Sequence, residues 1–312
     1  MKQTVSAFAP ATVANVGCGF DVFGFAIAEP GDTVRVSRRA GPGVVITTIS
    51  GDDGRLPKNA DENTAGFAVL RYLEKIKSRE GIDIELTKQL PLGSGMGSSA
   101  ASAVAALKAV NCLYDNPLSK EELLEIAIAA EASACGSSHA DNVAPALYGG
   151  FVLIRTNDPP DIIRLPVPEK LHCTLIHPDI EIKTRDARNI LPATIPLTTA
   201  VKQWANTAGL VAGLYQKNFD LLRRSSVDYI AEPLRSTLIP CFNEVKQTAM
   251  DHGAIACSIS GSGPALFALS ASRKTAQKVA LAMGKVFTRH SIAKQVYISG
   301  INSAGARIIH EE

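Results

Sequence analysis

The sequence of 312 residues lacks a strong charge of either sign, because 32 Lys and Arg residues balance 30 Asp and Glu residues and leave a net charge of +2. This balance gives no support to a polyelectrolyte partner, so we expect no nucleic acid to bind. No apolar run approaches the roughly 18 residues of a membrane span, so we expect no membrane partner either. The first five residues carry one Lys and then polar positions, which is unlike a secretory signal.

The chain also lacks any Cys-x-x-Cys motif. Its six cysteines are scattered, which is typical of reduced thiols in a core and predicts neither a disulfide framework nor a thiolate metal site. Together with the first residues, this pattern indicates a cytoplasmic protein. The cysteines are Cys18, Cys112, Cys135, Cys173, Cys241 and Cys257.

The length and composition predict a folded chain of about two domains. Apolar residues make up 46% and charged residues 20% of the sequence, which excludes disordered and fibrous classes. At roughly 100–200 residues per domain, this length suits two domains. Residues 158–168 are rich in proline, and we expect a loop there that separates an N-terminal domain, residues 1–163, from a C-terminal domain, residues 164–312.

Hydrophobic periodicity predicts both strands and helices. Alternating apolar residues, with turns at Gly31-Asp32 and Gly41-Pro42-Gly43, predict β-structure up to about residue 50. Ser119 followed by Glu122 predicts a capping box. This mixture favours the α+β class. Helices are expected over about 63–79, 100–113, 119–134, 198–230, 236–252 and 272–290, and strands over about 82–86, 151–154, 173–176, 254–258 and 296–298.

A glycine- and serine-rich segment follows the strand predicted over 82–86. Glycines let backbone N–H groups wrap an oxyanion, and the N-terminus of the helix that follows adds a favourable partial charge. We expect Ser98 or Ser99 to cap that helix, and either hydroxyl can also reach a phosphate or its Mg²⁺. The segment is neither G-x-x-x-x-G-K-[ST] nor G-x-G-x-x-G, so from these residues alone a tight connection remains an alternative to an anion site. The segment is Gly93-Ser94-Gly95-Met96-Gly97-Ser98-Ser99.

Three segments in order along the chain resemble the motifs of the GHMP kinase family of small-molecule kinases. They are Ala9-Pro10-Ala11-Thr12-Val13-Ala14-Asn15-Val16-Gly17, Pro91-Leu92-Gly93-Ser94-Gly95-Met96-Gly97-Ser98-Ser99-Ala100-Ala101 and Ser260-Gly261-Ser262-Gly263-Pro264-Ala265. The resemblance implies a two-domain GHMP kinase fold, with an N-terminal nucleotide-binding domain and a ferredoxin-like C-terminal domain. It also implies that residues 91–101, the phosphate loop, hold ATP, and that the segment 260–265 lies under this loop.

Two further segments, residues 18–24 and 139–150, resemble the members of the family that phosphorylate L-homoserine for threonine synthesis. L-Homoserine is a zwitterion, so its site needs an acid for the ammonium, and guanidinium groups are the best partners for the carboxylate. The resemblance assigns Asp21 to the ammonium, Arg188 and Arg235 to the carboxylate, and Asn142 to the attacking hydroxyl. The other substrate-binding residues that it implies are Asn15, His139, Asp141, Thr184 and Gly261.

The resemblance further implies Mg²⁺, held by Ser99 and Glu131, which with Asn142 form the expected catalytic set. Oxygen ligands of this kind suit Mg²⁺. An amide cannot accept the proton of the hydroxyl, so Asn142 can orient the hydroxyl but cannot deprotonate it. Because phosphoryl transfer passes through a loose transition state, we expect catalysis without a side-chain general base.

Alternatives to these interpretations stay open at this point. A kinase for another small alcohol, such as mevalonate or shikimate, needs no acid for an ammonium, and a non-catalytic nucleotide-binding protein would share the fold. Asp21 and Asp141 can equally be turn residues, and the two arginines can be surface ion pairs. Asn63 and Lys88 are positional candidates for adenine contacts, and a homodimer is possible.

Overall fold

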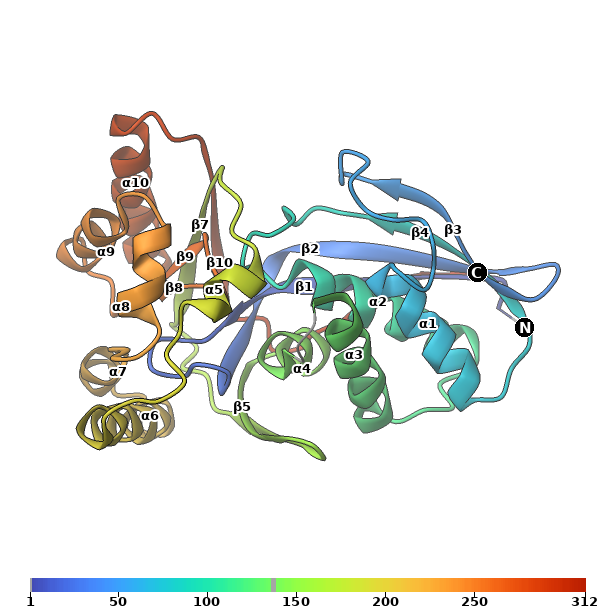
Figure 1. Ribbon diagram of the computed structural model, residues 1–312, viewed down its shortest axis with the longest axis horizontal. Helices are drawn as coiled ribbons and strands as arrows, with labels where there is room; N and C mark the ends of the chain where they lie inside the picture. Colours follow the sequence, from blue (N-terminus) through green and yellow to red (C-terminus); the bar gives the residue numbers. More distant parts are fainter. Residues whose placement is uncertain (1, 136–138) are drawn as a thin grey trace.

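A seven-stranded sheet forms the first part of the computed structural model, which describes residues 2–135 and 139–312 (Figure 1). The main path runs β11-β1-β2-β4-β3, while β5 pairs with β2 and with β6. β3 and β4 are parallel, and the other pairs are antiparallel. The strands are β1 (Thr4–Ala14), β2 (Phe23–Arg39), β3 (Gly43–Ser50), β4 (Gly81–Thr87), β5 (Phe151–Asn157), β6 (Pro160–Leu165) and β11 (Arg307–Glu311).

Four helices cover one face of this sheet: α1 (Thr64–Lys75), α2 (Ser98–Leu113), α3 (Lys120–Cys135) and α4 (Ala140–Tyr148). The predicted capping box before α3 is confirmed, because the Ser119 backbone N–H donates to Glu122 Oε2 at 3.0 Å and the Glu122 N–H donates to Ser119 Oγ at 3.2 Å. α2 is rich in alanine and almost wholly buried. It can therefore pack closely against both the sheet and its neighbouring helices.

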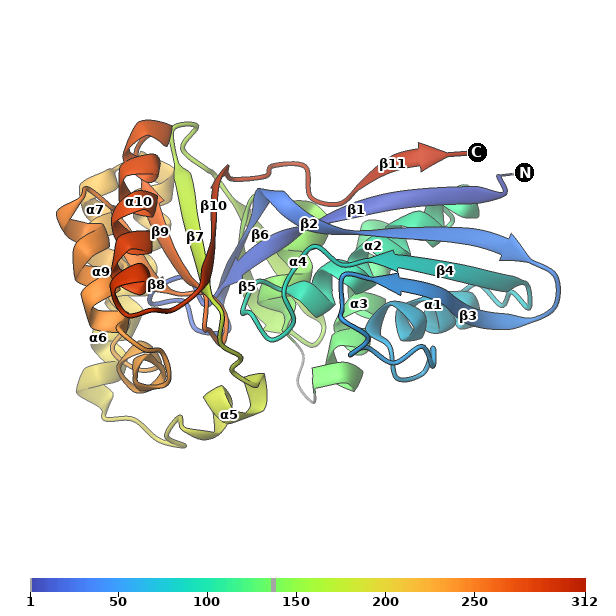
Figure 2. The same cartoon turned by 90° about the horizontal axis from the view of Figure 1, so that it is seen from above.

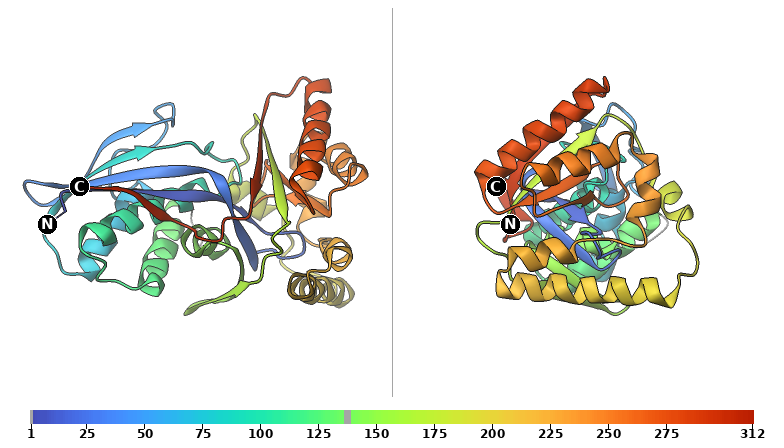
Figure 3. Two further views of the ribbon diagram at one scale, coloured as in Figure 1. Left: turned by 180° about the vertical axis from the view of Figure 1, so that it is seen from behind. Right: turned by 90° about the vertical axis from the view of Figure 1, so that its left-hand side faces the viewer.

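The second part is a four-stranded antiparallel sheet in the order β10-β7-β9-β8, with α9 and α10 on one face (Figure 3). The sequence β7, helices, β8, β9, α10, β10 is the β-α-β-β-α-β order of a ferredoxin-like unit, as predicted. Four helices, α5 to α8, lie between β7 and α9 in the chain. The elements are β7 (His172–Pro178), α5 (Thr184–Asn189), α6 (Leu197–Gln216), α7 (Phe219–Ser225), α8 (Glu232–Arg235), α9 (Phe242–Asp251), β8 (Ala256–Ile259), β9 (Leu266–Ser270), α10 (Arg273–Arg289) and β10 (Lys294–Gly300).

One apolar core joins the two parts. It takes residues from β1 and β2 and from β7 and β9. At the junction the ring of Phe25 meets that of Phe267 edge-on, with centroids 6.1 Å apart. Within the described ranges, no helix is long and apolar enough to cross a membrane.

The structure corrects several expectations. Residues 158–168 are not simply a loop, because β6 forms a hairpin with β5 there. Gly31 and Asp32 are not a turn, because they lie within the long strand β2. The division into residues 1–163 and 164–312 stays a prediction. The structure adds that β11 returns to the first sheet, where Val5 pairs with Glu311 and the two ends of the chain lie together (Figure 2).

Candidate active site

The phosphate loop runs between β4 and α2 with three glycines in the left-handed region of backbone conformation, Gly93, Gly95 and Gly97. A Cβ on Gly95 would lie 2.3 Å from the Ser260 carbonyl oxygen, and a Cβ on Gly97 would lie 2.0 Å from Thr12 Oγ1. Both positions therefore require glycine, for the backbone angle and for the space. The chain can only pack this closely against its neighbours without side chains there.

Helix α2 begins at Ser98 with Gly97 as its N-cap, and no side chain caps it. The prediction that Ser98 or Ser99 caps the helix is therefore wrong. Ser98 Oγ donates to the Leu90 carbonyl at 3.2 Å, and Ser99 Oγ donates to Glu131 Oε1 at 2.9 Å. Ser98 and Ser99, at the N-terminus of α2, line the cleft, and a helix N-terminus is a favourable place for a phosphate group.

The second glycine-rich segment, residues 260–265, lies directly against the phosphate loop, as predicted. Ser260 Oγ donates to the Gly95 carbonyl at 2.7 Å, and the Ala265 N–H donates to the Ser94 carbonyl at 3.1 Å. The Gly261 carbonyl accepts from Asn15 Nδ2 at 2.9 Å and from Arg235 Nη1 at 3.1 Å. This segment therefore connects the loop of the first part to Asn15 and Arg235, two of the residues predicted to bind the substrate.

A buried group of three side chains, which we call the loop clamp, forms hydrogen bonds on both sides of the glycine segment. It consists of Asp32, Lys88 and Ser102, and the sequence alone did not reveal it. Lys88 Nζ pairs with Asp32 and donates to Ser102 Oγ at 2.8 Å and to the carbonyl of Ser98, the first residue of α2, at 2.9 Å. Asp32 Oδ1 accepts from the backbone N–H groups of residues 89 and 90, just before the loop, at 2.9 and 3.2 Å.

The two charged side chains of the loop clamp are almost completely buried, which changes the pKa of Lys88. The side chains of Asp32 and Lys88 are 0% and 1% exposed. Burial lowers the pKa of Lys88, and the charge of Asp32 opposes that shift. The amine of Lys88 is thus committed to the clamp rather than to adenine. Asn63, the other positional candidate, lines the cleft but caps α1, with its Oδ1 accepting from the Ala65 N–H at 3.0 Å.

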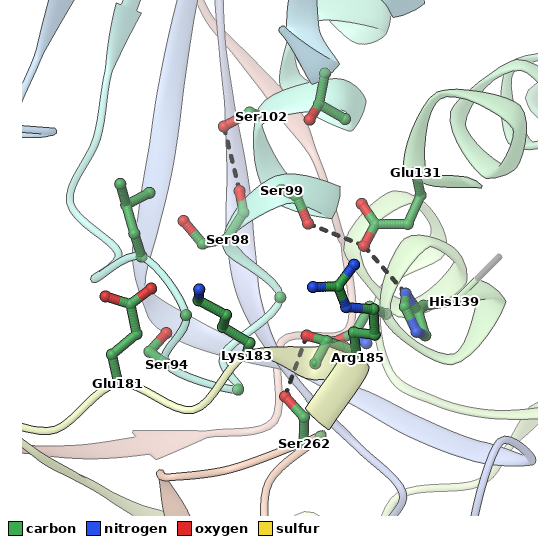
Figure 4. Close-up of a pocket in the computed structure, with 18 of the residues that line it drawn as sticks. Ser94, Ser98, Ser99, Ser102, Glu131, His139, Glu181, Lys183, Arg185 and Ser262 are labelled. Atoms are coloured by element: carbon green, nitrogen blue, oxygen red, sulfur yellow. Dashed lines mark hydrogen bonds and ion pairs between the residues drawn. The ribbon is translucent and has the colours of Figure 1, made fainter. Parts of the chain in front are cut away.

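Glu131, Ser99 and His139 meet at one corner of the cleft (Figure 4). Glu131 Oε1 accepts from Ser99 Oγ at 2.9 Å and lies 3.3 Å from His139 Nδ1. Burial lowers the pKa of His139, but the bond to Glu131 and the charges of Glu131 and Asp141 outweigh it, so the net pKa is raised. A hydroxyl and a carboxylate this close form a set of hard oxygen donors, which fits Mg²⁺.

Asn142 lies across the cleft with its amide fixed by a residue that the sequence did not single out. Thr12 Oγ1, in β1, donates to Asn142 Oδ1 at 2.7 Å, and Thr12 is fully buried. With Oδ1 occupied, the amide group directs its Nδ2 donor toward other partners. The only signal for Thr12 was its place in the first motif, residues 9–17.

Two guanidinium groups and one carboxylate surround Phe20. Arg188 Nη2 pairs with both oxygens of Asp21, at 2.9 and 3.0 Å. Arg235 is 4% exposed and donates through Nε to the Ala187 carbonyl at 2.9 Å. Arg188 Cζ and Arg235 Cζ lie 5.4 and 4.9 Å from the centroid of the Phe20 ring. The charges expected to bind a zwitterion are thus gathered in one place, with Asp21 and Arg188 paired to each other.

Asp141 lies behind this surface and not on it. It is 2% exposed and is the only substrate-binding candidate that does not line the cleft within the described ranges. Burial, followed by the charge of Asp21, raises the pKa of Asp141 to about 7, while His139 opposes the shift. Thr184 Oγ1, by contrast, faces the cleft 3.3 Å from Ser262 Oγ.

Most of the other predicted residues line one cleft of about 470 Å³. Within the phosphate loop, Pro91, Met96, Ala100 and Ala101 do not line it, and Met96 is fully buried. Lys183 and Arg185, which no motif in the sequence singled out, lie near the loop at the start of α5 (Figure 4). The predicted residues that do line the cleft are Asn15, Asp21, Leu92, Gly93, Ser94, Gly95, Gly97, Ser98, Ser99, Glu131, His139, Asn142, Thr184, Arg188, Arg235 and Gly261.

A glycine-rich loop at a helix N-terminus, in one cleft with charges that are complementary to a zwitterion, indicates a small-molecule phosphotransferase. Comparison with known families agrees with this class. Residues 63–150 match the model described as GHMP kinases N terminal domain, and residues 201–289 match GHMP kinases C terminal. A mevalonate kinase of L. major, solved in complex with R-mevalonate, shares the fold with a TM-score of 0.73 at 17% identity, covering 95% of this chain and 96% of its own.

Two proteins of much higher sequence identity indicate which branch of the family the chain belongs to. A homoserine kinase of Chlorobaculum tepidum is 52% identical, over 98% of this chain and 98% of its own length. The crystal structure of homoserine kinase from Cytophaga hutchinsonii has a TM-score of 0.97 at 55% identity, covering 99% of this chain and 98% of that one. The chain belongs to the GHMP kinase family and, within it, to the homoserine kinases.

Proposed function

We propose that this chain transfers the γ-phosphoryl group of ATP to the side-chain hydroxyl of L-homoserine, giving O-phospho-L-homoserine and ADP for threonine biosynthesis. The observation that carries the proposal is one cleft of about 470 Å³ lined both by the phosphate loop and by Asp21, Arg188 and Arg235. A phosphoryl donor and an amino-acid acceptor can lie there side by side. Positioning of this kind supplies much of the catalysis in phosphoryl transfer.

The phosphate loop and the N-terminus of α2 bind the phosphates of ATP in this proposal. Ser94 Oγ supports it, because this buried hydroxyl has no hydrogen-bond partner among the described residues although Ser94 lines the cleft. Lys183 and Arg185 add positive charge from the facing wall. Cations on that side stabilise the charge that spreads over the transferred phosphoryl oxygens.

The hydroxyl of Ser99 and the carboxylate of Glu131 are oxygen donors of the kind that Mg²⁺ prefers. These two residues would hold it, and when bound it would neutralise phosphate charge.

L-Homoserine binds through its two charged groups. Arg188 and Arg235 hold the carboxylate, and Asp21 holds the ammonium, in charge-assisted hydrogen bonds. Arg188 Nε is buried and has no partner among the described residues, which leaves a donor for the carboxylate. Asn15, Thr184, His139 and Gly261 complete the pocket.

The hydroxyl oxygen attacks the γ-phosphorus as the bond to ADP breaks, and its proton leaves to the transferred phosphoryl group or to water. Asn142 orients the hydroxyl through Nδ2, because Thr12 occupies its Oδ1. Asp141 has a pKa suited to a base, about 7, but it does not line the cleft. No side-chain general base is therefore required.

We further place the enzyme in the cytoplasm, where ATP and a free amino acid are both available. Within the described ranges, Cys18, Cys112, Cys173, Cys241 and Cys257 are free thiols, which suits a reducing compartment. No nucleic acid or membrane partner is invoked.

An ADP-release assay with Mg-ATP tests the function, with L-homoserine compared to L-serine, L-threonine, mevalonate and shikimate. We expect a strong preference for L-homoserine, lost in Arg235→Ala and in Glu131→Gln. Preference for an acid without an ammonium group would keep the kinase and reject the amino-acid acceptor. ATP binding without turnover of any acceptor would favour a non-catalytic nucleotide-binding protein.

A further inference from the structure

Helices α9 and α10 lie side by side on one face of the second sheet (Figure 1, Figure 2). Val245 of α9 and Phe287 of α10 are fully buried in one apolar cluster. This packing brings the N-terminus of α9 to the C-terminus of α10, where Glu244 Oε2 lies 2.8 Å from His290 Nε2. The apolar core, and not the polar side chains alone, therefore fixes the two helix ends beside each other.

Three side chains that can each ligate a metal ion meet at this junction: Cys241, Glu244 and His290. The cysteine sulfur, one carboxylate oxygen and one imidazole nitrogen all lie within 4.8 Å of one another. The ligand atoms of a tetrahedral zinc ion lie roughly 3.3–3.6 Å apart, so small side-chain rotations suffice to enclose one. Among the side chains that the structure describes, no other three of the Cys, His, Asp and Glu types bring ligand atoms this close together.

The group is open to solvent, so a metal ion can reach it. The side chains of Glu244 and His290 are 41% and 46% exposed, and Cys241 is partly exposed. Accessibility of this kind distinguishes Cys241 from the other free thiols within the described ranges, which are all buried. Those buried thiols are Cys18, Cys112, Cys173 and Cys257.

The backbone at Cys241 has a conformation that favours glycine. Its φ of 59° and ψ of 15° are left-handed, and the residue is the N-cap of α9 without a side-chain capping hydrogen bond. Local stability does not explain a cysteine there, because glycine adopts this conformation freely and Ser, Asn or Asp would cap the helix better. Residues held in such conformations cluster at functional sites.

The two helix ends suit the charges of a bound metal and its ligands. A helix N-terminus favours anions, here a thiolate and the Glu244 carboxylate, and a helix C-terminus favours a cation, here beside His290, the C-cap of α10. The thiolate and the carboxylate together balance a divalent cation. Arg289 Nη2 donates to Glu244 Oε1 at 2.6 Å, which leaves Oε2 toward His290. Outer hydrogen bonds of this kind orient ligating carboxylates.

We propose that Cys241, Glu244 and His290 bind a Zn²⁺ ion that joins α9 to α10, with a water molecule in the fourth position. The thiol proton is released to solvent as the sulfur binds. A thiolate with an imidazole selects Zn²⁺, whereas oxygen donors alone suit Mg²⁺. The bound ion should stabilise the second part of the molecule, since it binds only where the two helix ends are together.

This zinc site is separate from the cleft, because none of its three residues lines the cleft. The proposal therefore does not depend on the reaction proposed above, and its tests do not use kinase activity. It departs from the expectation, drawn from the sequence, that the chain has no thiolate metal site. No motif indicates the group, because 46 positions separate Glu244 from His290.

Titration of the metal-free protein with Zn²⁺ alone, without nucleotide, supplies the first test. Competition with a chromophoric chelator should show one equivalent bound with micromolar or tighter affinity, and saturation should raise the melting temperature. Glu131→Gln should retain this equivalent, because Glu131 belongs to the cleft. No bound equivalent, or one that is lost in Glu131→Gln, would overturn the proposal.

Variants of the ligands locate the site. Cys241→Ser and His290→Ala should each weaken zinc binding about a hundredfold or more, since loss of even an outer hydrogen bond costs a metal site about ten- to a hundredfold. His252→Ala is the matched control, because His252 is also exposed and follows α9 at its other end. It should bind Zn²⁺ like the unmodified protein. Unchanged affinity in both ligand variants would place the ion elsewhere and reject the site.

Cobalt in place of zinc identifies the sulfur ligand. One equivalent of Co²⁺ should give an intense thiolate-to-cobalt charge-transfer band, which should be absent in Cys241→Ser and kept in His252→Ala. A cobalt complex without this band would show that sulfur is not a ligand and would contradict the proposal.

Cys241→Gly removes the ligand and the unfavourable backbone conformation together. The metal-free variant should melt no lower than the metal-free unmodified protein, because glycine adopts the left-handed conformation freely. Added Zn²⁺ should no longer raise its melting temperature. A variant that Zn²⁺ still stabilises to the same extent would exclude Cys241 from the site.

Discussion

At the scale of single residues, the site depends on side chains that fix the direction of other side chains. Asn142 is the clearest case. Its side-chain amide has an oxygen that accepts hydrogen bonds and a nitrogen that donates them. The hydrogen bond from Thr12 to the oxygen determines that the nitrogen meets the hydroxyl group of the substrate. Thr12 thus acts through Asn142 as a positioning residue in the proposed reaction.

Replacing Thr12 by Val keeps the shape of this buried residue but removes the donor. We expect kcat to fall roughly five- to tenfold, the effect of about 1 kcal/mol for one hydrogen bond, with KM for ATP unchanged. Thr12→Ser keeps the hydroxyl and should restore kcat to near the unmodified value. Steady-state kinetics of both variants check this, and full activity in Thr12→Val would remove Thr12 from the mechanism.

Asp141 gives a second prediction at this scale, on stability and pH. Its pKa is raised from 3.8 to about 7 by burial and by Asp21, so between these values the folded state binds more protons than the unfolded state. Stability therefore falls as pH rises through this window and levels off above about 7.

Asp141→Asn should remove this slope and stabilise the protein at pH 8 by on the order of 2–4 kcal/mol. Denaturant unfolding at several pH values between 4 and 8 measures it. The raised pKa of His139 contributes a slope of the same sign, so a smaller slope should persist in the variant. An unchanged profile would mean that Asp141 is ionised at neutral pH.

At the scale of secondary-structure elements, the loop clamp joins β2, the end of β4 and α2. Asp32 holds the residues before the phosphate loop, and Lys88 holds the first carbonyl of α2. The two ends of the loop are thereby held at a fixed separation. A buried ion pair of this kind adds specificity of conformation more readily than stability.

Lys88→Met alone leaves a buried carboxylate without its cation and should destabilise the fold by about 3–5 kcal/mol. Adding Asp32→Asn removes that charge, while the Asn oxygen can still accept from residues 89 and 90. We expect the double variant to regain most of its stability but to keep a KM for ATP about tenfold above normal, because α2 has lost its tie.

Thermal unfolding and steady-state kinetics separate the two effects. Ser102→Ala serves as the control, because it leaves the bond from Lys88 to the Ser98 carbonyl in place. If both the stability and the KM for ATP of the double variant return to the values of the unmodified protein, the clamp has a structural role only.

The elements also show what sequence could and could not reveal. The glycine segments could be predicted, because left-handed backbone and close contacts permit few other residues at Gly95 and Gly97. The role of Asp32 could not be predicted, because an Asp that follows a Gly is typical of a turn. Only the tertiary structure places this residue inside β2 with its side chain buried. β6 was missed because Pro159 and Pro160, at its start, are typical of a loop. β11 was missed because its partner, β1, lies at the other end of the chain.

At the scale of the whole molecule, the phosphate loop belongs to the first part but rests on the second. Gly95 and Gly93 allow this contact to be tested, since both have left-handed backbone. A Cβ at Gly95 would strike the rigid carbonyls of Ser260 and Gly263, whereas a Cβ at Gly93 would meet the flexible side chain of Glu181.

Both Gly→Ala variants should lose about 1–2 kcal/mol to the backbone conformation. Gly95→Ala should lose roughly 1–3 kcal/mol more, because the loop must move away from the segment 260–265. Calorimetry of the two variants measures the difference. Equal melting temperatures would show that the two parts do not depend on this contact.

The pairing of β1 with β11 has a consequence for the time course of synthesis. Val5 leaves the ribosome well before its partner Glu311, because 306 positions of the sequence separate the two residues. At 5–20 residues per second, that delay is on the order of 15 seconds to a minute. Through that interval the outer edge of β1 has no strand beside it, and an open edge is where chains associate wrongly. Nascent chains of this enzyme should therefore be most exposed to aggregation, and most dependent on chaperones, until β11 emerges.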